Sequence, residues 1–250
     1  MSFGPLAGID PSALSRIAQL GGDFIRERSE TDCIQQNGAF CFEWAAENID
    51  RYVAPTLEHL VLVSISVALG FGIALAMAIY SHRRRWLVPA LTGATGVLYT
   101  VPSIAFFFLL LPITGRGNVT AIIALTAYTL QIIYRNVVAG LANVPEASKD
   151  AGRGMGMTHR QLLWRVELPL ALPETIAGLR IATVSTVALA TLAVFAGAGG
   201  LGAEIYPGGI TFKTGVIITG SIAILMAVGF DALLLGVQRL LAPWRRVRPL

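Results

Sequence analysis

Long apolar runs alternate with short polar, basic or glycine-rich segments along the whole of this chain. Five runs have about 20 or more residues, the length that an α-helix needs to cross the hydrocarbon core of a bilayer. Helix is the expected state, because lipid offers backbone groups no hydrogen-bond partner and the runs are too continuous for the alternating strands of a β-barrel. The five predicted transmembrane helices occupy residues 56–80, 87–113, 119–140, 175–197 and 215–241.

The composition agrees with an all-α integral membrane protein. Of the 250 residues, 54% are hydrophobic and 14% are charged, and the mean hydropathy is +0.66. A soluble domain has about 25% charged residues and uses them to cover its surface. The net charge of +4 is not gathered in a basic patch interleaved with aromatic residues. We therefore expect membrane lipid, and no nucleic acid, as a partner.

The distribution of Lys and Arg predicts the orientation in the membrane, because basic residues concentrate in cytoplasmic segments. Residues 1–55 carry eight acidic and four basic residues and form the tail before the first predicted helix. Three basic segments fall on the other side of a five-span chain, namely 81–86, 141–174 and 242–250. We therefore expect an external N-terminal tail and a cytoplasmic basic C-terminal tail.

Both cysteines of the chain, Cys33 and Cys41, lie in the predicted external tail. An oxidising compartment permits a disulfide between them, which would close a small loop. Spacing does not establish the geometry that a disulfide needs, so two free thiols are the alternative.

The connector between the third and fourth predicted helices contains a compact polar block, residues 145–173. The segment PEASKDAGR (145–153) favours a short helix, and Gly154 and Gly156 permit a sharp turn after it. The block would then lie along the cytoplasmic membrane surface as a helix, a turn and a second helix.

Two pairs of residues predict the limits of the second short helix. Thr158 and Gln161 have the spacing of a capping box, so the helix is expected to begin there. Pro169 and Pro173 are expected to break it before the fourth span. A structured connector of this length is long for a loop, which favours a docking surface for a cytoplasmic partner over a plain connector.

The polar block resembles the EAA loop of type I ABC importer permeases. In that loop Glu-Ala-Ala is followed after three residues by Gly, and after nine more by Ile-x-Leu-Pro. Asp150 stands here for the glutamate and Gly152 for the second alanine, and this glycine weakens the first helix by about 1 kcal/mol. The matching residues in this chain are Asp150, Ala151, Gly152, Gly156, Val166, Leu168 and Pro169.

The resemblance covers about residues 55–240 and is specific to one group of permeases. YTVPS (99–103), 153–173 and GAGGLG (197–202) are similar to segments of the permeases for glycine betaine, choline, carnitine and proline. The resemblance implies one permease domain, 56–241, in the plasma (inner) membrane of a bacterium. It also implies a second permease, identical or a sister chain, and an external solute-binding protein.

In this family two ATP-binding subunits drive alternating access, and the short helix of the EAA loop fits a cleft on such a subunit. This chain has no G-x-x-x-x-G-K-[ST] phosphate loop, so ATP is expected in the partner and no cofactor in this chain. No metal is expected, because the three histidines lack metal-ligand spacing. The resemblance implies ATPase-coupling roles for Asp150, Ala151, Gly152, Gly156, Leu168 and Pro169.

The candidate residues of a solute path lie in the second and third predicted helices. Pro102 removes a helix hydrogen bond and should kink the second helix, and kinked helices often line transport paths. Tyr99, Phe106 and Tyr128 carry ring faces that attract a methylammonium group. Plain packing is the alternative for all four residues.

Asp231 is an acidic residue well inside a predicted span, where a carboxylate must face protein or water. Arg180 and Arg135 lie at comparable depth, and we expect an ion pair between Asp231 and one of them. A role for Asp231 with the solute or with a proton is the alternative.

Two other functions stay open beside import of a compatible solute. The first keeps the fold and carries another small solute, such as an amino acid. The second is an intramembrane enzyme, which would need a nucleophile with a neighbouring base. No Ser or Cys in the predicted spans has such a context, so the second function is the less favoured.

Overall fold

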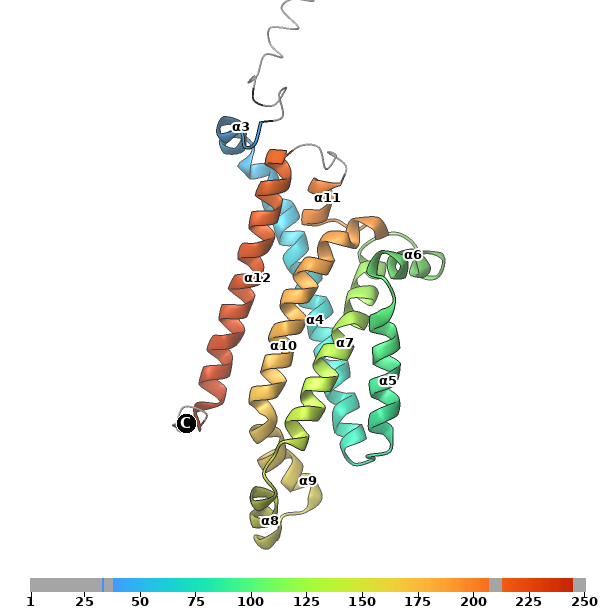
Figure 1. Ribbon diagram of the computed structural model, residues 1–250, viewed down its shortest axis with the longest axis vertical. Helices are drawn as coiled ribbons and strands as arrows, with labels where there is room; N and C mark the ends of the chain where they lie inside the picture. Colours follow the sequence, from blue (N-terminus) through green and yellow to red (C-terminus); the bar gives the residue numbers. More distant parts are fainter. Residues whose placement is uncertain (1–32, 34–37, 207–212, 245–250) are drawn as a thin grey trace, which may run out of the picture.

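The computed structural model describes residue 33 and residues 38–206 and 213–244, so most of the predicted external and basic tails lies outside it. Within these ranges every regular element is a helix (Figure 1). The α-helices are α3 (Phe42–Glu47), α4 (Val53–His82), α5 (Leu87–Thr100), α6 (Ser103–Thr114), α7 (Asn118–Ala142), α8 (Glu146–Gly154), α9 (His159–Leu162), α10 (Leu168–Ala190), α11 (Leu201–Ile205) and α12 (Lys213–Leu241). Shorter turns are Ile49–Tyr52, Leu163–Glu167 and Thr191–Ala196.

The long helices α4, α7, α10 and α12 run along the length of the molecule beside α5 (Figure 1). The α4–α5 connection, the pair α8 and α9, and the end of α12 all lie at one end, drawn at the bottom. Four described segments are long and apolar enough to cross a membrane, and α5 with α6 is a fifth if counted as one span. This agrees with the predicted placement of the basic segments on one side.

The second predicted span, 87–113, is not one continuous helix. It is broken into α5 and α6, whose axes are bent by 97°. The break occurs because Val101 and Pro102 are both extended, with ψ near 130°, and a residue before proline is biased away from the helical region. The predicted kink at Pro102 is therefore a complete break, and α6 leaves the direction of the bundle.

The fourth span is longer than 175–197, and the predicted break at Pro169 and Pro173 is wrong. Helix continues from His159 to Ala196. A proline clashes with the carbonyl four residues earlier, and for Pro169 this carbonyl belongs to Arg165, inside the π-helical turn Leu163–Glu167. The wider ring of that turn gives the proline room, so the helix passes through.

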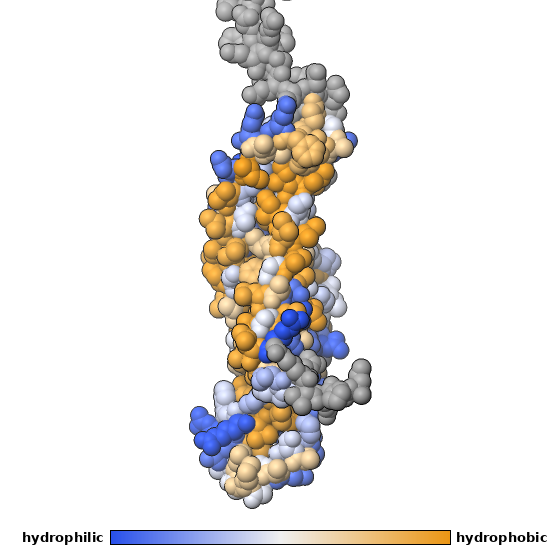
Figure 2. All heavy atoms as spheres, turned by 90° about the vertical axis from the view of Figure 1, so that its left-hand side faces the viewer, coloured by the Kyte–Doolittle hydropathy of each residue, from blue (hydrophilic) through white to orange (hydrophobic). Residues whose placement is uncertain are grey.

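Small residues bring the central helices close together. A Cβ on Gly70 of α4 would lie 1.7 Å from Thr129 Oγ1 of α7, and one on Gly178 of α10 would lie 2.3 Å from Asn136 Cβ of α7. Such close approach is typical of helix pairs in membranes, where packing replaces the hydrophobic effect. Apolar side chains predominate over the middle of the face that carries α12 in Figure 2, and polar ones gather towards the ends. This surface suits contact with lipid.

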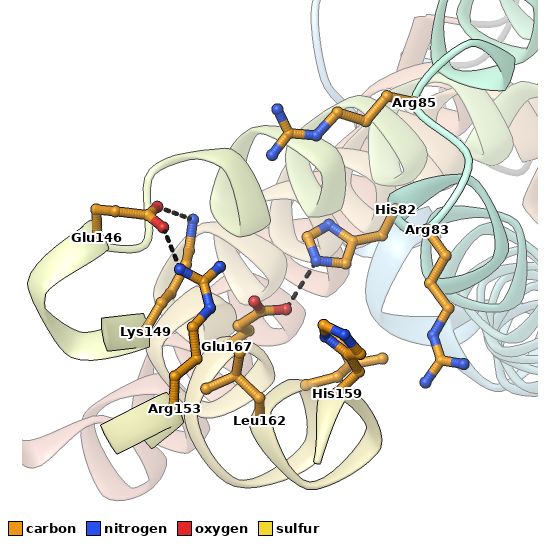
Figure 3. A pocket seen from close by; sticks show the side chains of 10 residues that line it. His82, Arg83, Arg85, Glu146, Lys149, Arg153, His159, Leu162 and Glu167 are labelled. Carbon is orange, nitrogen blue, oxygen red and sulfur yellow. Dashed lines mark hydrogen bonds and ion pairs between the residues drawn. The ribbon is translucent and has the colours of Figure 1, made fainter. Parts of the chain in front are cut away.

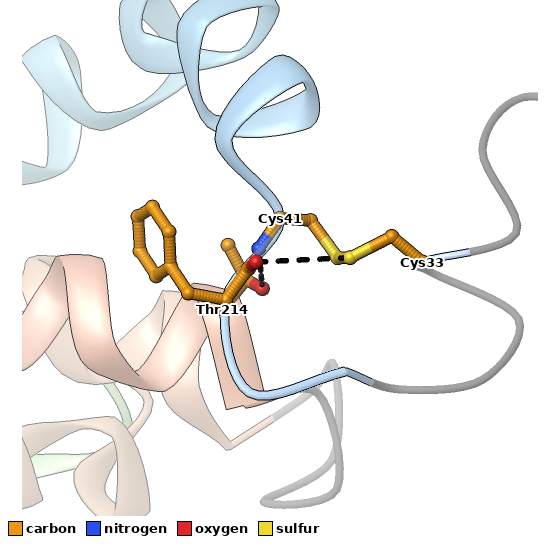
Figure 4. Close-up of a disulfide and its surroundings, with 4 residues drawn as sticks. Cys33, Cys41 and Thr214 are labelled. Carbon is orange, nitrogen blue, oxygen red and sulfur yellow. Dashed lines mark hydrogen bonds between the residues drawn. A yellow bond between two sulfur atoms is a disulfide. The ribbon is translucent and has the colours of Figure 1, made fainter.

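A disulfide joins Cys33 to Cys41 at the end of the bundle opposite α8 and α9, where the sequence predicted either a disulfide or free thiols (Figure 4). The backbone N–H of Cys41 donates to Thr214 Oγ1, 3.0 Å away and buried, at the start of α12. Close by, Arg51 Nε donates to Glu204 Oε2 at 2.6 Å and connects the start of the first span to α11. The disulfide-bonded segment is thus attached to the bundle.

Removal of this disulfide is expected to lower the free energy of local unfolding around α3 by about 2–3 kcal/mol. The loss comes from the entropy of closing so short a loop. Hydrogen exchange of residues 42–52 in the Cys33→Ser/Cys41→Ser variant measures the change. Treating the wild type with reductant should give the same acceleration, and the variant should not respond to reductant. Equal exchange in reduced and oxidised wild type would contradict a stabilising role.

Candidate coupling site and solute path

The predicted polar block forms a projection at the lower end of the molecule, made of α8, a turn and α9 (Figure 1). Asp150 and Ala151 are exposed on α8, and Gly152 is buried. A Cβ on Gly152 would lie 2.6 Å from Leu162 Cδ1 of α9. The glycine that departs from the EAA pattern therefore stands where α8 packs closely on α9.

Gly156 makes the turn between α8 and α9 because its φ is +76°, a region that favours glycine. Its N–H donates to the Arg153 carbonyl at 2.9 Å, and the N–H of Met157 donates to the Gly152 carbonyl at 3.1 Å. These two bonds are those of a Schellman motif with glycine at C′. The glycine of the EAA-like pattern thus has a backbone role, which is to end α8 and reverse the chain.

The second short helix begins at the predicted capping box. Gln161 N–H donates to Thr158 Oγ1, and Thr158 N–H donates to Gln161 Oε1 at 2.8 Å. The π-helical turn then leads directly into α10, where Leu168 and Pro169 are half-buried. This continuous helix connects α9 directly to the membrane-spanning part of α10.

Ion pairs fix the first short helix. Arg153 donates to Glu146 at 3.0 Å and to Asp150 at 2.9 Å, and Lys149 donates to Glu146 at 3.2 Å. Hydrogen bonds from Lys149 and Arg153 hold the pKa of Glu146 below its usual value, and bonds to Glu146 and Asp150 raise the pKa of Arg153. The lowered pKa of Glu146 and the raised pKa of Arg153 both favour the charged forms, so these ion pairs on α8 persist near neutral pH.

A hollow of about 380 Å³ lies between the projection and the end of α4 (Figure 3). His82 Nε2 of α4 lies 2.7 Å from Glu167 Oε2 of the π-helical turn, across this hollow. Neither this contact nor the burial of Lys149 beside it was predicted from the sequence. The available signal was a charged residue, Glu167, between the apolar Val166 and Leu168 in a helix that packs on the bundle.

The predicted path residues meet around the break between α5 and α6. Tyr128 packs edge-to-face on Tyr99 and Phe106, with ring centroids 5.9 and 5.7 Å away. Tyr128 also donates its hydroxyl to the Val101 carbonyl, which the break next to Pro102 leaves without a helical partner. Phe106 and Tyr128 are 8% and 5% exposed, whereas Tyr99 is 44% exposed, so Tyr99 is the one of the three rings with a substantially open face.

Asp231 pairs with Arg180, one of its two predicted partners. The contact is bidentate, with Arg180 Nε 2.8 Å from Asp231 Oδ1 and Nη2 2.7 Å from Oδ2, and it joins α10 to α12. Gln238 Nε2 makes a second polar contact between these helices, at 3.1 Å from the Pro173 carbonyl. Arg135 instead lies on the exposed side of α7 and lines a separate hollow with Tyr99.

Membrane-length helices and a structured polar projection at one end define an integral membrane protein of helical type. The chain belongs to the family of binding-protein-dependent transport system inner membrane components, whose family model matches residues 68–247. It is 38% identical over 172 residues to the choline transport system permease protein OpuBD of Bacillus subtilis, covering 68% of this chain and 76% of that protein.

Three further similarities extend over more of the chain. The osmoprotectant import permease protein OsmW of Salmonella typhimurium is 36% identical over 203 residues, or 79% of this chain and 94% of OsmW. A chain of the MetNI methionine ABC transporter in an inward-facing conformation superposes with a TM-score of 0.65 at 25% identity, covering 74% of this chain and 95% of that one. A chain of an amino acid ABC transporter solved with histidines has a TM-score of 0.66 at 19% identity, covering 80% and 98%, and shares the fold.

Proposed function

We propose that this chain is the permease subunit of an ATP-driven ABC importer for a compatible solute such as glycine betaine, choline, carnitine or proline. The observation that carries the proposal is its similarity to permeases named for choline, osmoprotectants and carnitine, at 36–42% identity. Import of an amino acid is less well supported, because the methionine and amino acid transporters of the same fold are 25% and 19% identical. An enzyme is not supported, since the relatives are transport subunits.

ATP hydrolysis takes place in separate subunits, two in each complex, and this chain needs no cofactor of its own. The projection formed by α8 and α9 is the part that contacts them. Ala151 and Met155 lie four residues apart and so share a face of the first short helix and its end, and Met155 is 69% exposed. In the proposed complex this exposed apolar pair is buried by the ATP-binding subunit. Asp150, Gly152, Gly156, Leu168 and Pro169 shape this surface or connect it to α10.

The N-terminus lies outside the cell and the C-terminus in the cytoplasm. Support comes from the basic connectors, which favour the cytoplasmic side, and from the Cys33–Cys41 disulfide at the opposite end, which suits an oxidising compartment. A second permease, identical or a sister chain, completes the path, and an external binding protein delivers the solute. The subunit is placed in the inner membrane by its family.

Uptake by the whole complex in proteoliposomes tests the proposal. The permease, its ATP-binding subunits and its binding protein are reconstituted, and radiolabelled glycine betaine, carnitine, choline and proline are offered with ATP. We expect ATP-dependent accumulation of at least one of these solutes, and none when the ATP-binding subunit is omitted. Accumulation of another amino acid with none of the four solutes would contradict the assignment of the substrate class.

A further inference from the structure

A stripe of five residues, three of them polar, runs along α7 in the membrane-spanning part of the bundle. It consists of residues at positions i, i+1, i+4, i+5 and i+8, which share one face of a helix. Together with Tyr99 of α5 and Ile181 of α10, the stripe lines a hollow of about 460 Å³. Its members are Gln131, Ile132, Arg135, Asn136 and Ala139.

Arg135 is the charged residue among those that line this hollow. It lies seven residues before the end of α7, about 10 Å along the helix. Arg180 has Asp231 as its partner, but in the described ranges no ion pair forms at Arg135. A guanidinium at such a position faces protein or water rather than lipid, so this face of α7 borders an aqueous space or a second subunit.

The polar groups beside Arg135 are held in place by the bundle. Thr95 of α5 donates its hydroxyl to Gln131 Oε1, and Asn136 Nδ2 donates to the Ile132 carbonyl at 2.8 Å. Gly178 of α10 allows the backbone to approach Asn136 closely, because any Cβ there would overlap that side chain. The stripe is therefore a built surface rather than a set of loose side chains.

We propose that Arg135 binds the carboxylate of the transported solute, so that zwitterions carrying both a carboxylate and a quaternary ammonium pass best. The inference rests on the proposed function and adds a preference within it. A guanidinium binds a carboxylate through two parallel hydrogen bonds, while the exposed ring of Tyr99 in the same hollow attracts a methylated ammonium. The volume lies within the range of about 300–1,000 Å³ of small-molecule sites.

This arrangement discriminates between solutes of the same class. Glycine betaine and carnitine carry a carboxylate that neutralises the field of Arg135. Choline carries a hydroxyl in its place, so its net positive charge meets an uncompensated guanidinium. A like charge near the path raises the energy of the passing cation, and choline therefore moves more slowly than the zwitterions at equal saturation of the binding protein.

The test compares maximal uptake rates of the reconstituted complex for radiolabelled glycine betaine and choline, at saturating binding protein. Arg135→Gln removes the charge and keeps a polar, though shorter, side chain. It is expected to lower the ratio of the glycine betaine rate to the choline rate by about tenfold or more, the loss typical of a charge-assisted hydrogen bond. Arg135→Lys keeps the charge but not the bidentate geometry, and its ratio should lie between those of the wild type and Arg135→Gln.

Four other results would overturn the proposed role of Arg135, and they differ in what they leave of the proposed function. An equal fall of both rates in Arg135→Gln would overturn it, because a purely structural role or a contact with a second permease does not distinguish the solutes. A wild type that imports choline and no carboxylate-bearing solute would also overturn it, while leaving the proposed function intact. If the wild type imports no choline, equal losses of glycine betaine uptake in the Gln and Lys variants would overturn it. A wild type that imports none of these solutes would remove the proposed function and the inference together.

Discussion

Uptake by the assembled importer is expected to fall about 5- to 30-fold when Gly156 is replaced by valine. The φ of Gly156 is +76°, and an L-residue in this region costs about 1–2 kcal/mol, which lowers the ratio of formed to unformed turn by that factor. A β-branched side chain is the least tolerated there. Loss of the turn releases α9 from α8, so force from the ATP-binding subunit no longer reaches α10.

The matched control lies two residues away. Gly154 is exposed at the end of α8, its φ is not positive, and an added Cβ meets nothing within 4 Å. Gly154→Ala should therefore transport like the wild type. Initial rates of solute uptake, normalised to the amount of permease in the membrane, measure both variants. Wild-type rates for Gly156→Val would show that the turn is not needed for coupling.

Replacing Asp231 by alanine is expected to destabilise the permease, with a fall in its thermal midpoint of several °C, because the charge of Arg180 within a span then has no partner. Arg180 would keep its charge inside the membrane part of the bundle without the bidentate carboxylate that now faces it. The same contact holds α12 to α10, and α12 has few other buried side chains. The midpoint is measured on purified protein in detergent or nanodiscs.

A double-mutant cycle separates the ion pair from the loss of either side chain. Arg180→Ala/Asp231→Ala removes both charges and should recover most of the midpoint lost in Asp231→Ala, because no isolated charge remains. Additive effects of the two single changes would contradict a stabilising ion pair, and would leave the alternative role of Asp231 with the solute or a proton.

Periodicity and end signals predicted much of the fold. Long apolar runs located four membrane-length segments, and Thr158 with Gln161 located the start of α9, because both signals are local in the chain. A kink at Pro102 was predicted, but its extension to a complete break between α5 and α6 was not, since the residues on both sides of Pro102 are apolar. The break is stabilised by Tyr128 of α7, which donates a hydrogen bond to the Val101 carbonyl that lacks a helical partner.

The passage of helix through Pro169 and Pro173 was mispredicted for a different reason. A π-helical turn has no sequence signal of its own in this chain, and the turn is what accommodates Pro169. Contacts between segments far apart in the chain could not be predicted from the sequence either. His82 and Glu167 are 85 residues apart, and nothing in their spacing pairs them.

The residues predicted for a solute path lie close together, but the sequence did not distinguish their surroundings. Tyr99, Phe106 and Tyr128 do lie together, although Phe106 and Tyr128 are buried in the core beside the helix break. Arg135 was considered as a partner for Asp231 because depth along a span can be counted from the sequence. The face of a helix that meets a neighbour cannot be counted in the same way, and here it is set by the packing of α7 on α10.

We expect the projection of α8 and α9 to be cytoplasmic and to receive force from a separate ATP-binding subunit. Crosslinking between the projection and that subunit tests both expectations. A cysteine placed by Met155→Cys, which is exposed and distant from the bonded Cys33 and Cys41, should form a crosslink to the ATP-binding subunit in membranes, with an efficiency that changes when ATP is added. Absence of that crosslink, together with labelling of the new cysteine by a membrane-impermeant thiol reagent in intact cells, would contradict the account.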